Sequence, residues 1–233
     1  MKSIDESKLI VPTAEELVDI NNLYQKPPKL ISSYEEMGRI VRAHKELGKL
    51  IIFLSGTFDL IHVGHKRYFR TAIWLLCKRM GKTKNDFILI VGVDNDAEVR
   101  KRKGELRPVV IQDERAEMLD GLEDVTYVVI KEEEEFGWKL GELLEPDFLI
   151  LSESTNFLNE DSREAMLQKL GLWAKRIVIL PPQAETSTTG KIHKLHTQTI
   201  GDLESTIIPA LEKQFGSTID GLRQILKEFR GGG

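Results

Sequence analysis

The sequence is poor in cysteine, in long apolar runs and in excess charge of either sign. Its 233 residues include one cysteine, Cys77, which excludes an internal disulfide bond and a zinc site built from several cysteines. No apolar run approaches the roughly 20 residues of a membrane-spanning helix. Asp5 and Glu6 fall where a secretory signal needs apolar residues. We therefore expect a soluble cytoplasmic protein with no membrane partner.

The charge and the composition exclude two further classes of protein. Lys and Arg total 33 against 37 Asp and Glu, a net charge of −4, so the chain lacks the basic excess of nucleic-acid-binding proteins. Apolar residues make up 41% and charged residues 30%, which is typical of a folded globular chain and not of a disordered one. We expect a globular protein with no nucleic-acid partner.

Short apolar runs alternate along the chain with amphipathic segments. The runs have the length of strands and lie at residues 50–54, 87–93, 125–130, 148–151 and 176–180. Helical patterns lie between them at 65–80, 113–122, 136–144 and 161–173. Continuously apolar strands that alternate with helices predict a parallel sheet with helices on both faces. The expected fold class is therefore α/β, with a Rossmann-like parallel sheet.

Helical patterns flank this α/β region. Capping boxes at residues 13–16 and 33–36 predict two helices near the start of the chain. Apolar residues at helical spacing after residue 201 predict two short helices near its end, which would form either a lid over the sheet's edge or a dimer surface. We divide the chain into an N-terminal helical extension (1–49), an α/β domain (50–198) and a C-terminal helical extension (199–233).

The most informative segment follows the first of these strands. Residues 55–65 read Ser-Gly-Thr-Phe-Asp-Leu-Ile-His-Val-Gly-His and lead into a helix, where open parallel sheets bind ligands and helix N–H groups attract phosphate. Gly56 permits a tight turn, and Gly64 permits the close approach of a flat base. His62 and His65 share a helix face and suit phosphate oxygens, although an isolated pair is also an ordinary polar cap. No metal site is expected, because no suitable third ligand lies nearby.

Three later stretches carry polar residues after other strands. Asp94 opens an acidic segment that turns basic and ends at Lys103, Arg115 follows an Arg-Pro-Val sequence, and residues 186–189 read Thr-Ser-Thr-Thr. Taken alone, the basic run is a solvated face, Arg115 is a surface ion-pair residue and the hydroxyl run is a helix N-cap.

Together these motifs resemble the nucleotidylyltransferase superfamily, whose hallmark is His-x-Gly-His after the first strand. The resemblance runs from about residue 33 to residue 193. It is nearest to the heptose-phosphate adenylyltransferase domain, with the glycerol-3-phosphate cytidylyltransferases as close cousins. It implies transfer of a nucleoside monophosphate from ATP or CTP to a phosphorylated small molecule, a sugar or polyol phosphate, with release of pyrophosphate.

The resemblance also implies roles for individual residues. The catalytic residues would be His62, His65 and Lys103, with Lys101 as the alternative to Lys103, while Asp59 would hold the loop. The nucleotide would be bound by Gly56, Thr57, Phe58, Gly64, Asp94, Arg115, Ser187, Thr188 and Thr189. Mg²⁺ would accompany the triphosphate, since it prefers substrate phosphates to an all-protein cage. Many relatives are dimers, so a homodimer is the expected assembly.

Two stretches depart from the pattern of these relatives. Pro182 stands where the cytidylyltransferases carry an arginine, which favours adenine without settling the base. Residues 151–157 lack the lysine and the glycines of the heptose branch, which leaves the acceptor open. This altered loop and the C-terminal helices motivate a second hypothesis, a regulatory protein that binds a nucleotide without turning it over.

Overall fold

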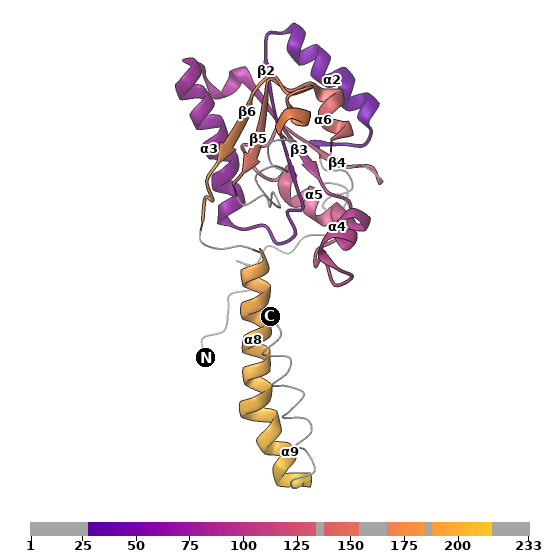
Figure 1. The fold of residues 1–233 in the computed structure, drawn as a ribbon, viewed down its shortest axis with the longest axis vertical. Helices are drawn as coiled ribbons and strands as arrows, with labels where there is room; N and C mark the ends of the chain where they lie inside the picture. Colours follow the sequence, from indigo (N-terminus) through magenta and orange to yellow (C-terminus); the bar gives the residue numbers. More distant parts are fainter. Residues whose placement is uncertain (1–27, 134–137, 154–166, 185–187, 216–233) are drawn as a thin grey trace, which may run out of the picture.

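A computed structural model describes residues 28–133, 138–153, 167–184 and 188–215 (Figure 1). Within these residues six strands form one sheet in the order β1-β4-β3-β2-β5-β6, and every neighbouring pair runs parallel. The strands are β1 (Leu30–Ile31), β2 (Leu50–Gly56), β3 (Phe87–Val93), β4 (Tyr127–Ile130), β5 (Phe148–Ser152) and β6 (Ile177–Leu180).

Helices connect the strands and continue beyond the last one. The α-helices are α2 (Tyr34–Glu46), α3 (Val63–Met80), α4 (Asp96–Lys103), α5 (Gln112–Asp120), α6 (Lys139–Leu144), α8 (Thr188–Asp202) and α9 (Ile208–Phe215). A 3-10 turn, η2 (Lys84–Asp86), precedes β3, and a π turn, η3 (Leu203–Ile207), joins α8 to α9. None of these described helices is long and apolar enough to cross a bilayer.

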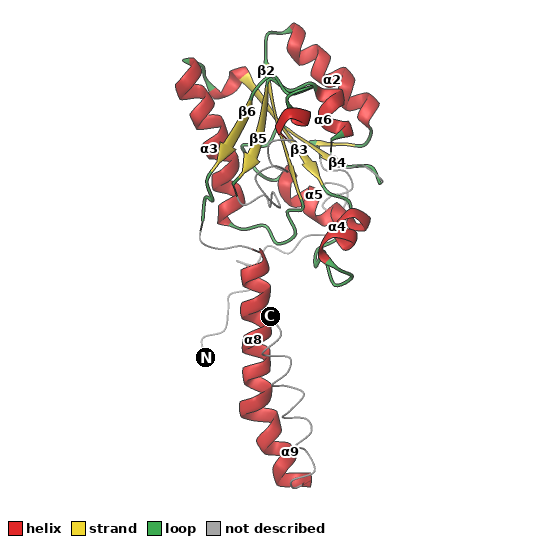
Figure 2. Cartoon of the chain, viewed as in Figure 1, coloured by secondary structure: helices red, strands yellow, loops and turns green. Residues whose placement is uncertain are grey.

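The sheet is apolar on both faces because helices cover both. Along β2, Ile52 and Leu54 pack with α3 and α5 on one face, whereas Ile51 and Phe53 pack with α2 and α6 on the other. This alternation follows from the period of two residues in a strand. Figure 2 shows the yellow strands between the red helices. The prediction of a Rossmann-like α/β fold is confirmed.

The position of β2 in the sheet determines where a ligand binds. The chain runs from β2 through β3 to β4 on one side, then returns to β5 and β6 on the other side of β2. The carboxyl end of β2 is therefore the topological switch point of the sheet, where open parallel sheets commonly bind ligands. The loop at residues 57–62, which leads into α3, begins at this point.

The described part of the expected N-terminal extension belongs to the sheet and its core. β1 extends the sheet by pairing with β4, and Met37 and Val41 of α2 are buried against it. The Ser33 capping prediction is confirmed, since Ser33 Oγ accepts a hydrogen bond from the Glu36 N–H at 3.1 Å. The capping box at residues 13–16 and most of the pattern at 161–173 lie outside the described residues.

The C-terminal helices differ from the expected lid. α8 and α9 extend away from the α/β body as a rod (Figure 1), so in the described structure they do not cover the edge of the sheet. The expected domain boundary at residue 199 also falls inside α8, which runs without interruption from Thr188 to Asp202. Amphipathic spacing identified a helix here but carried no information about what the helix packs against.

Replacement of Met37 tests whether α2 is integral to the domain. Its side chain is completely buried, so Met37→Ala leaves a cavity between α2 and the sheet and should lower the free energy of unfolding by about 2–5 kcal/mol. Urea unfolding measures the change. Arg39→Ala, on the exposed face of the same helix, is the control and should stay within about 0.5 kcal/mol. Equal, small effects of both substitutions would identify α2 as a detachable extension.

Candidate active site

Two histidines stack against each other where the loop after β2 enters α3. The ring centroids of His62 and His65 lie 4.0 Å apart with an interplanar angle of 27°. His62 Nδ1 accepts from the Gly64 N–H at 3.1 Å, and His65 Nδ1 accepts from the His62 N–H at 3.3 Å. A backbone N–H only donates, so each neutral ring carries its proton on Nε2. No described residue hydrogen-bonds either Nε2, which leaves two N–H donors for a ligand.

Burial keeps this pair of histidines neutral. Desolvation, followed by the charge of Lys191, lowers the pKa of His62. Desolvation, followed by His62, Lys191 and Lys103, lowers the pKa of His65 to about 4. At neutral pH both imidazoles are therefore uncharged hydrogen-bond donors and not general acids.

Gly64, which has no side chain, and the ring of Phe58 shape the space around the histidines. A Cβ on Gly64 would lie 2.8 Å from the His62 ring and 3.3 Å from the Cβ of Ala184, so only glycine fits. Phe58 packs its ring edge against His65, with centroids 5.4 Å apart, and also against Phe69. Its backbone φ of 50° is in the left-handed region, which is uncommon for a residue with a side chain. The buried Phe58 ring therefore supports the histidines.

Asp59 anchors the loop, as expected. Its Oδ1 accepts from the N–H groups of Val109 and Val110 at 2.8 and 2.9 Å, and its Oδ2 accepts from Arg107 Nε at 2.7 Å. The residue is 3% exposed, so this carboxylate is fully engaged within the protein.

Arg115, which the resemblance assigns to nucleotide binding, is committed to hydrogen bonds within the protein. Its side chain has no exposed surface. Nε donates to the carbonyl of Val110 at 2.9 Å, Nη1 donates to the carbonyl of Thr57, and Nη2 donates to the carbonyl of Asp94 at 2.8 Å and to Asp96 Oδ1 at 2.6 Å. All three nitrogens are thus used inside the protein, and Arg115 positions the loops that surround the site.

Asp94, also assigned to nucleotide binding by the resemblance, is likewise bound within the protein. Its Oδ1 lies 2.6 Å from Lys131 Nζ. Its Oδ2 accepts from Thr57 Oγ1 at 3.0 Å and from Arg102 Nη2. Burial alone would raise the pKa of Asp94, but Lys131 and Arg102 outweigh that effect and lower it. Thr57, also expected to bind nucleotide, is buried and directs its hydroxyl to Asp94.

Sequence analysis missed Arg102 and Lys131. Arg102 lies within the basic run, from which the resemblance singled out Lys103 as the phosphate-binding residue. Lys131 had a usable signal, because it directly follows β4, and the carboxyl ends of parallel strands meet at one edge of the sheet.

Lys103 ends α4 on the same side as the histidines. The residue is exposed, yet partial desolvation and then the charges of Arg107 and Arg102 lower its pKa. Its charge in turn acts on His65, as does that of Lys191 in the first turn of α8. The structure therefore brings His62, His65 and Lys103 within electrostatic reach of one another and of the start of α8.

The hydroxyl run is only partly visible. Ser187 lies outside the described residues. Thr188 and Thr189 open α8, but their side chains are also outside the described part.

Gly56 is the last residue of β2. A Cβ at this position would lie 3.2 Å from the ring of Phe58.

The described side chains do not form a cage for a divalent cation. No cluster of three or more His, Cys, Asp or Glu residues occurs among them. The carboxylates of Asp59 and Asp94 are already bound to cationic side chains. Mg²⁺ brought in by a triphosphate would be held mainly by the phosphates, as this small, strongly hydrated ion prefers.

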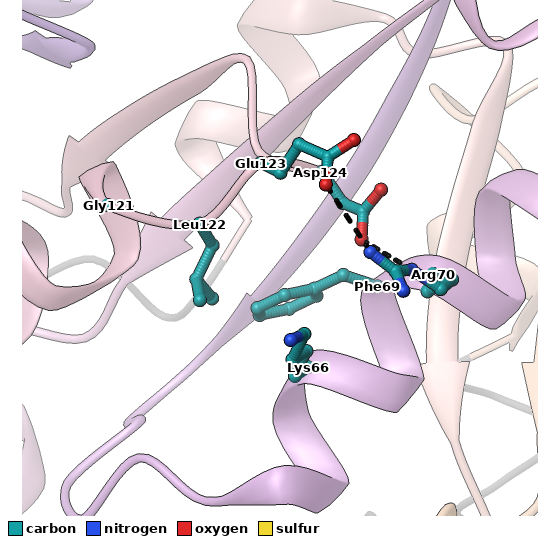
Figure 3. Close-up of a pocket in the computed structure, with 7 residues that line it drawn as sticks. All are labelled: Lys66, Phe69, Arg70, Gly121, Leu122, Glu123 and Asp124. Carbon is teal, nitrogen blue, oxygen red and sulfur yellow. Dashed lines mark hydrogen bonds and ion pairs between the residues drawn. The ribbon is translucent and has the colours of Figure 1, made fainter.

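A separate pocket lies between α3 and the loop after α5 (Figure 3). Its charged lining residues are Lys66, Arg70, Glu123 and Asp124. Arg70 lies 3.5 Å from Glu123 and 3.2 Å from Asp124. Lys84 contacts the same two carboxylates, each at 3.1 Å, so both acids of this pocket are already paired with cations of the protein. The pocket also places Lys66, the neighbour of His65 in sequence, outside the histidine site.

The lowered pKa of His65 predicts a loss of stability in acid. Because its pKa falls from the ordinary 6.5 to about 4 on folding, the unfolded chain binds the proton more tightly. The contribution is fully present above about pH 6.5 and is lost as the pH falls towards about 4. Urea unfolding across this window should show a shallower pH dependence for His65→Gln than for the unsubstituted protein. Identical slopes would contradict the burial of a neutral imidazole.

Comparison with known proteins places this geometry in a family. Bifunctional protein HldE of a Nitratiruptor species is 37% identical over 140 residues, covering 59% of this chain and 28% of that protein. HldE of Aliarcobacter butzleri is 40% identical over 120 residues, covering 52% of this chain and 23% of that protein. The chain thus matches only about a quarter of the length of these curated relatives.

A solved structure and a family model also match. A lipopolysaccharide core biosynthesis protein from Thermoplasma volcanium aligns with a TM-score of 0.45 and 24% identity, over 58% of this chain and 98% of that one. The sequence model described as cytidylyltransferase-like matches residues 53–195, more than half of the chain. The chain therefore belongs to the cytidylyltransferase-like family of nucleotidyltransferases.

Proposed function

We propose that the protein transfers the nucleoside monophosphate of ATP to a sugar phosphate and releases pyrophosphate. The observation that carries the proposal is the stacked pair His62 and His65, whose Nδ1 atoms are committed to backbone N–H groups. Two neutral Nε2–H donors at a helix N-terminus suit a phosphoryl centre that gains negative charge in the transition state.

The reaction proposed is an in-line displacement at the α-phosphorus. An oxygen of the acceptor phosphate forms the new bond to phosphorus, while the bond to the β-phosphate oxygen breaks and pyrophosphate leaves with that electron pair. The acceptor phosphate is already ionised at neutral pH, so no strong general base is required. Catalysis then rests on positioning and on charge stabilisation.

We assign each group one part of this task. His62 and His65 donate to the α-phosphate oxygens, and Lys103 supplies positive charge to the phosphates. Ser187, Thr188 and Thr189, with the first N–H groups of α8, hold the leaving pyrophosphate. The triphosphate enters as its Mg²⁺ complex, which is part of the substrate. Asp59, Asp94 and Arg115 hold the loops in place.

The connection from β6 to α8 supports adenine as the base. Pro182 replaces the arginine that cytidylyltransferases carry there. The neighbouring Gln183 uses both ends of its amide within the protein, since its Oε1 accepts from Thr71 and its Nε2 donates to the carbonyl of Pro181. The loss of the arginine removes a donor that the cytidylyltransferases have here, which favours ATP over CTP.

Other features complete the proposal. The HldE relatives and the resemblance to the heptose-phosphate adenylyltransferase domain support a sugar phosphate as acceptor.

We propose a cytoplasmic homodimer, for which the exposed apolar side chains of Leu106, Val109 and Ile111 offer one surface. We also propose that the nucleotidyltransferase unit begins at β1, not at residue 50, because β1 and α2 share its core.

Pyrophosphate release tests this function directly. Purified protein is incubated with Mg²⁺ and either ATP or CTP, each against a panel of sugar, polyol and amino-alcohol phosphates. We expect release with ATP and a sugar phosphate, and the product identified by mass spectrometry. Release only with CTP would overturn the assignment of the base. Silence across the panel, together with nucleotide binding in a parallel titration, would favour the regulatory hypothesis.

Loss of one histidine should abolish turnover without unfolding the protein. His65→Ala removes an Nε2–H donor from the α-phosphate, and we expect turnover to fall by about 10²-fold or more while the far-UV circular dichroism spectrum stays unchanged. Lys66→Ala is the matched control, because that side chain lines the separate pocket, and it should retain activity. Near-normal turnover by His65→Ala would refute the assignment of this site.

A further inference from the structure

Asp94 contacts two cations, although one would neutralise it. Lys131 Nζ lies 2.6 Å from Oδ1, and both side chains are almost fully buried, with 8% and 4% of their surface exposed. Arg102 contacts Oδ2 from the end of α4, and 53% of its side-chain surface is exposed. Lys131 therefore supplies the buried counter-charge that an interior carboxylate needs. The charge of Arg102 is surplus, and it faces solvent.

Arg102 keeps most of its hydrogen-bonding capacity. Its Nη2 contacts Asp94 Oδ2 and lies 3.5 Å from Thr57 Oγ1. Its Nε and Nη1 make no hydrogen bond to any residue in the described ranges. A guanidinium is a planar fork with five N–H groups, suited to gripping phosphate. Asp94 therefore fixes one corner of this fork and leaves the remaining donors free, an arrangement that lowers the entropic cost of binding.

Arg102 lies at the carboxyl ends of the central strands. Thr57 and Asp94 directly follow Gly56 and Val93, which are paired at the ends of the central strands β2 and β3. Arg102 spans these two residues, one of which lies in the loop that leads to the histidines. It is also the neighbour in sequence of Lys103, at the carboxyl edge of the sheet where ligands bind.

Positive charge is crowded here without a matching anion. Arg102 and Arg107 both act electrostatically on Lys103. Together with Lys131 these residues make four cations. Two carboxylates, Asp59 and Asp94, pair with three of the four and leave Lys103 without a carboxylate partner among the described residues. Like charges held together repel unless an anion binds between them, and a substrate phosphate carries the charge that this site lacks.

We propose that Arg102 is a further substrate-binding residue, which grips a substrate phosphate through its free Nε and Nη1 while Asp94 holds the guanidinium in position. The proposal rests on the nucleotidyl transfer proposed above and adds a residue to that site. The phosphate belongs either to the triphosphate or to the acceptor, and the two sources are separable by experiment. Asp94 acts here through Arg102 and is a positioning residue.

Steady-state kinetics of Arg102→Met identifies the source of the phosphate. Loss of a charge-assisted contact should raise one KM roughly 10- to 100-fold. A rise in the KM for ATP assigns Arg102 to the triphosphate, and a rise in the KM for the sugar phosphate assigns it to the acceptor. Unchanged KM values for both substrates would overturn the proposal.

Arg100→Met is the matched control. It removes the same charge from the same helix, but residues two apart on a helix do not face the same way. Arg100 is exposed, and its substitution should leave both KM values within about twofold. An equal rise in both variants would overturn the proposal in favour of a general field effect. Arg102→Lys, which keeps the charge but loses the planar fork, should recover only part of the affinity.

The role of Asp94 is tested by a double-mutant cycle. Asp94→Asn keeps the shape of the side chain but weakens its hold on Arg102, so it should raise the same KM as Arg102→Met. Combined with Arg102→Met it should add little further, because both substitutions remove one interaction. A merely structural role for Asp94 would instead give additive effects, and additivity would overturn the positioning assignment.

A binding measurement separates failure of this proposal from failure of the proposed function. Isothermal titration of the full chain with Mg²⁺-ATP, with inorganic pyrophosphate and with glucose 1-phosphate needs no turnover. If the unsubstituted protein binds any of these and Arg102→Met binds it at least tenfold more weakly, the assignment of Arg102 stands even without a competent acceptor. Equal binding by both proteins overturns it, whatever the activity assay shows.

Discussion

The guanidinium of Arg115 is the interaction on which the geometry of the site depends. It is completely buried and donates to the carbonyls of Thr57, Asp94 and Val110, which belong to three separate segments of chain. Buried backbone carbonyls beyond the ends of strands need hydrogen-bond donors, because no neighbouring strand supplies an N–H there. Asp96 balances the charge at 2.6 Å, without which a buried guanidinium would cost about 3–5 kcal/mol. One side chain thereby fixes the loops after β2 and β3 relative to each other.

The histidines offer neutral hydrogen-bond donors, whereas the positive charge of the candidate site comes from other residues. Because backbone N–H groups occupy both Nδ1 atoms, and because the rings are partly buried, His62 and His65 offer directional donors without charge. Positive charge comes from a separate element, from Lys103 at the end of α4, whose charge acts on His65. A phosphoryl centre between them would therefore meet both oriented N–H groups and cations, which suits charge that spreads over several oxygens.

The sequence was sufficient for the architecture and for a candidate site, but not for the contacts that its charged residues make within the protein. Short apolar runs predicted five of the strands, and the motif with His62 and His65 predicted a site at the end of β2. The two-residue strand β1 was missed because so short a segment has no periodicity. Helix α4 was missed because its charged sequence carries one buried side chain, Val99, and so lacks an apolar stripe.

Site roles escaped prediction for a different physical reason. Arg115 and Asp94 match the motif, yet whether a charged side chain faces a ligand or its own backbone depends on contacts between distant segments. Arg115 reaches Thr57 across 58 positions of sequence, and Asp94 pairs with Lys131, 37 positions away. A motif records which residue types occur at a site but not which of them are consumed in building it.

Charge compensation distinguishes the groups that build this site from those available to substrates. Arg115 with Asp96, Lys131 with Asp94, and Arg107 with Asp59 each join a cation and a carboxylate, and in each pair at least one partner is almost fully buried. Such pairs are formed because an isolated interior charge is too costly, so their energy is already committed to the fold. Arg102 is 53% exposed and Lys103 is also exposed, and both exceed the carboxylates around them. The uncompensated charge therefore lies at the carboxyl edge of the sheet, where the phosphate of the proposed substrate would complete the balance that the folded chain leaves open.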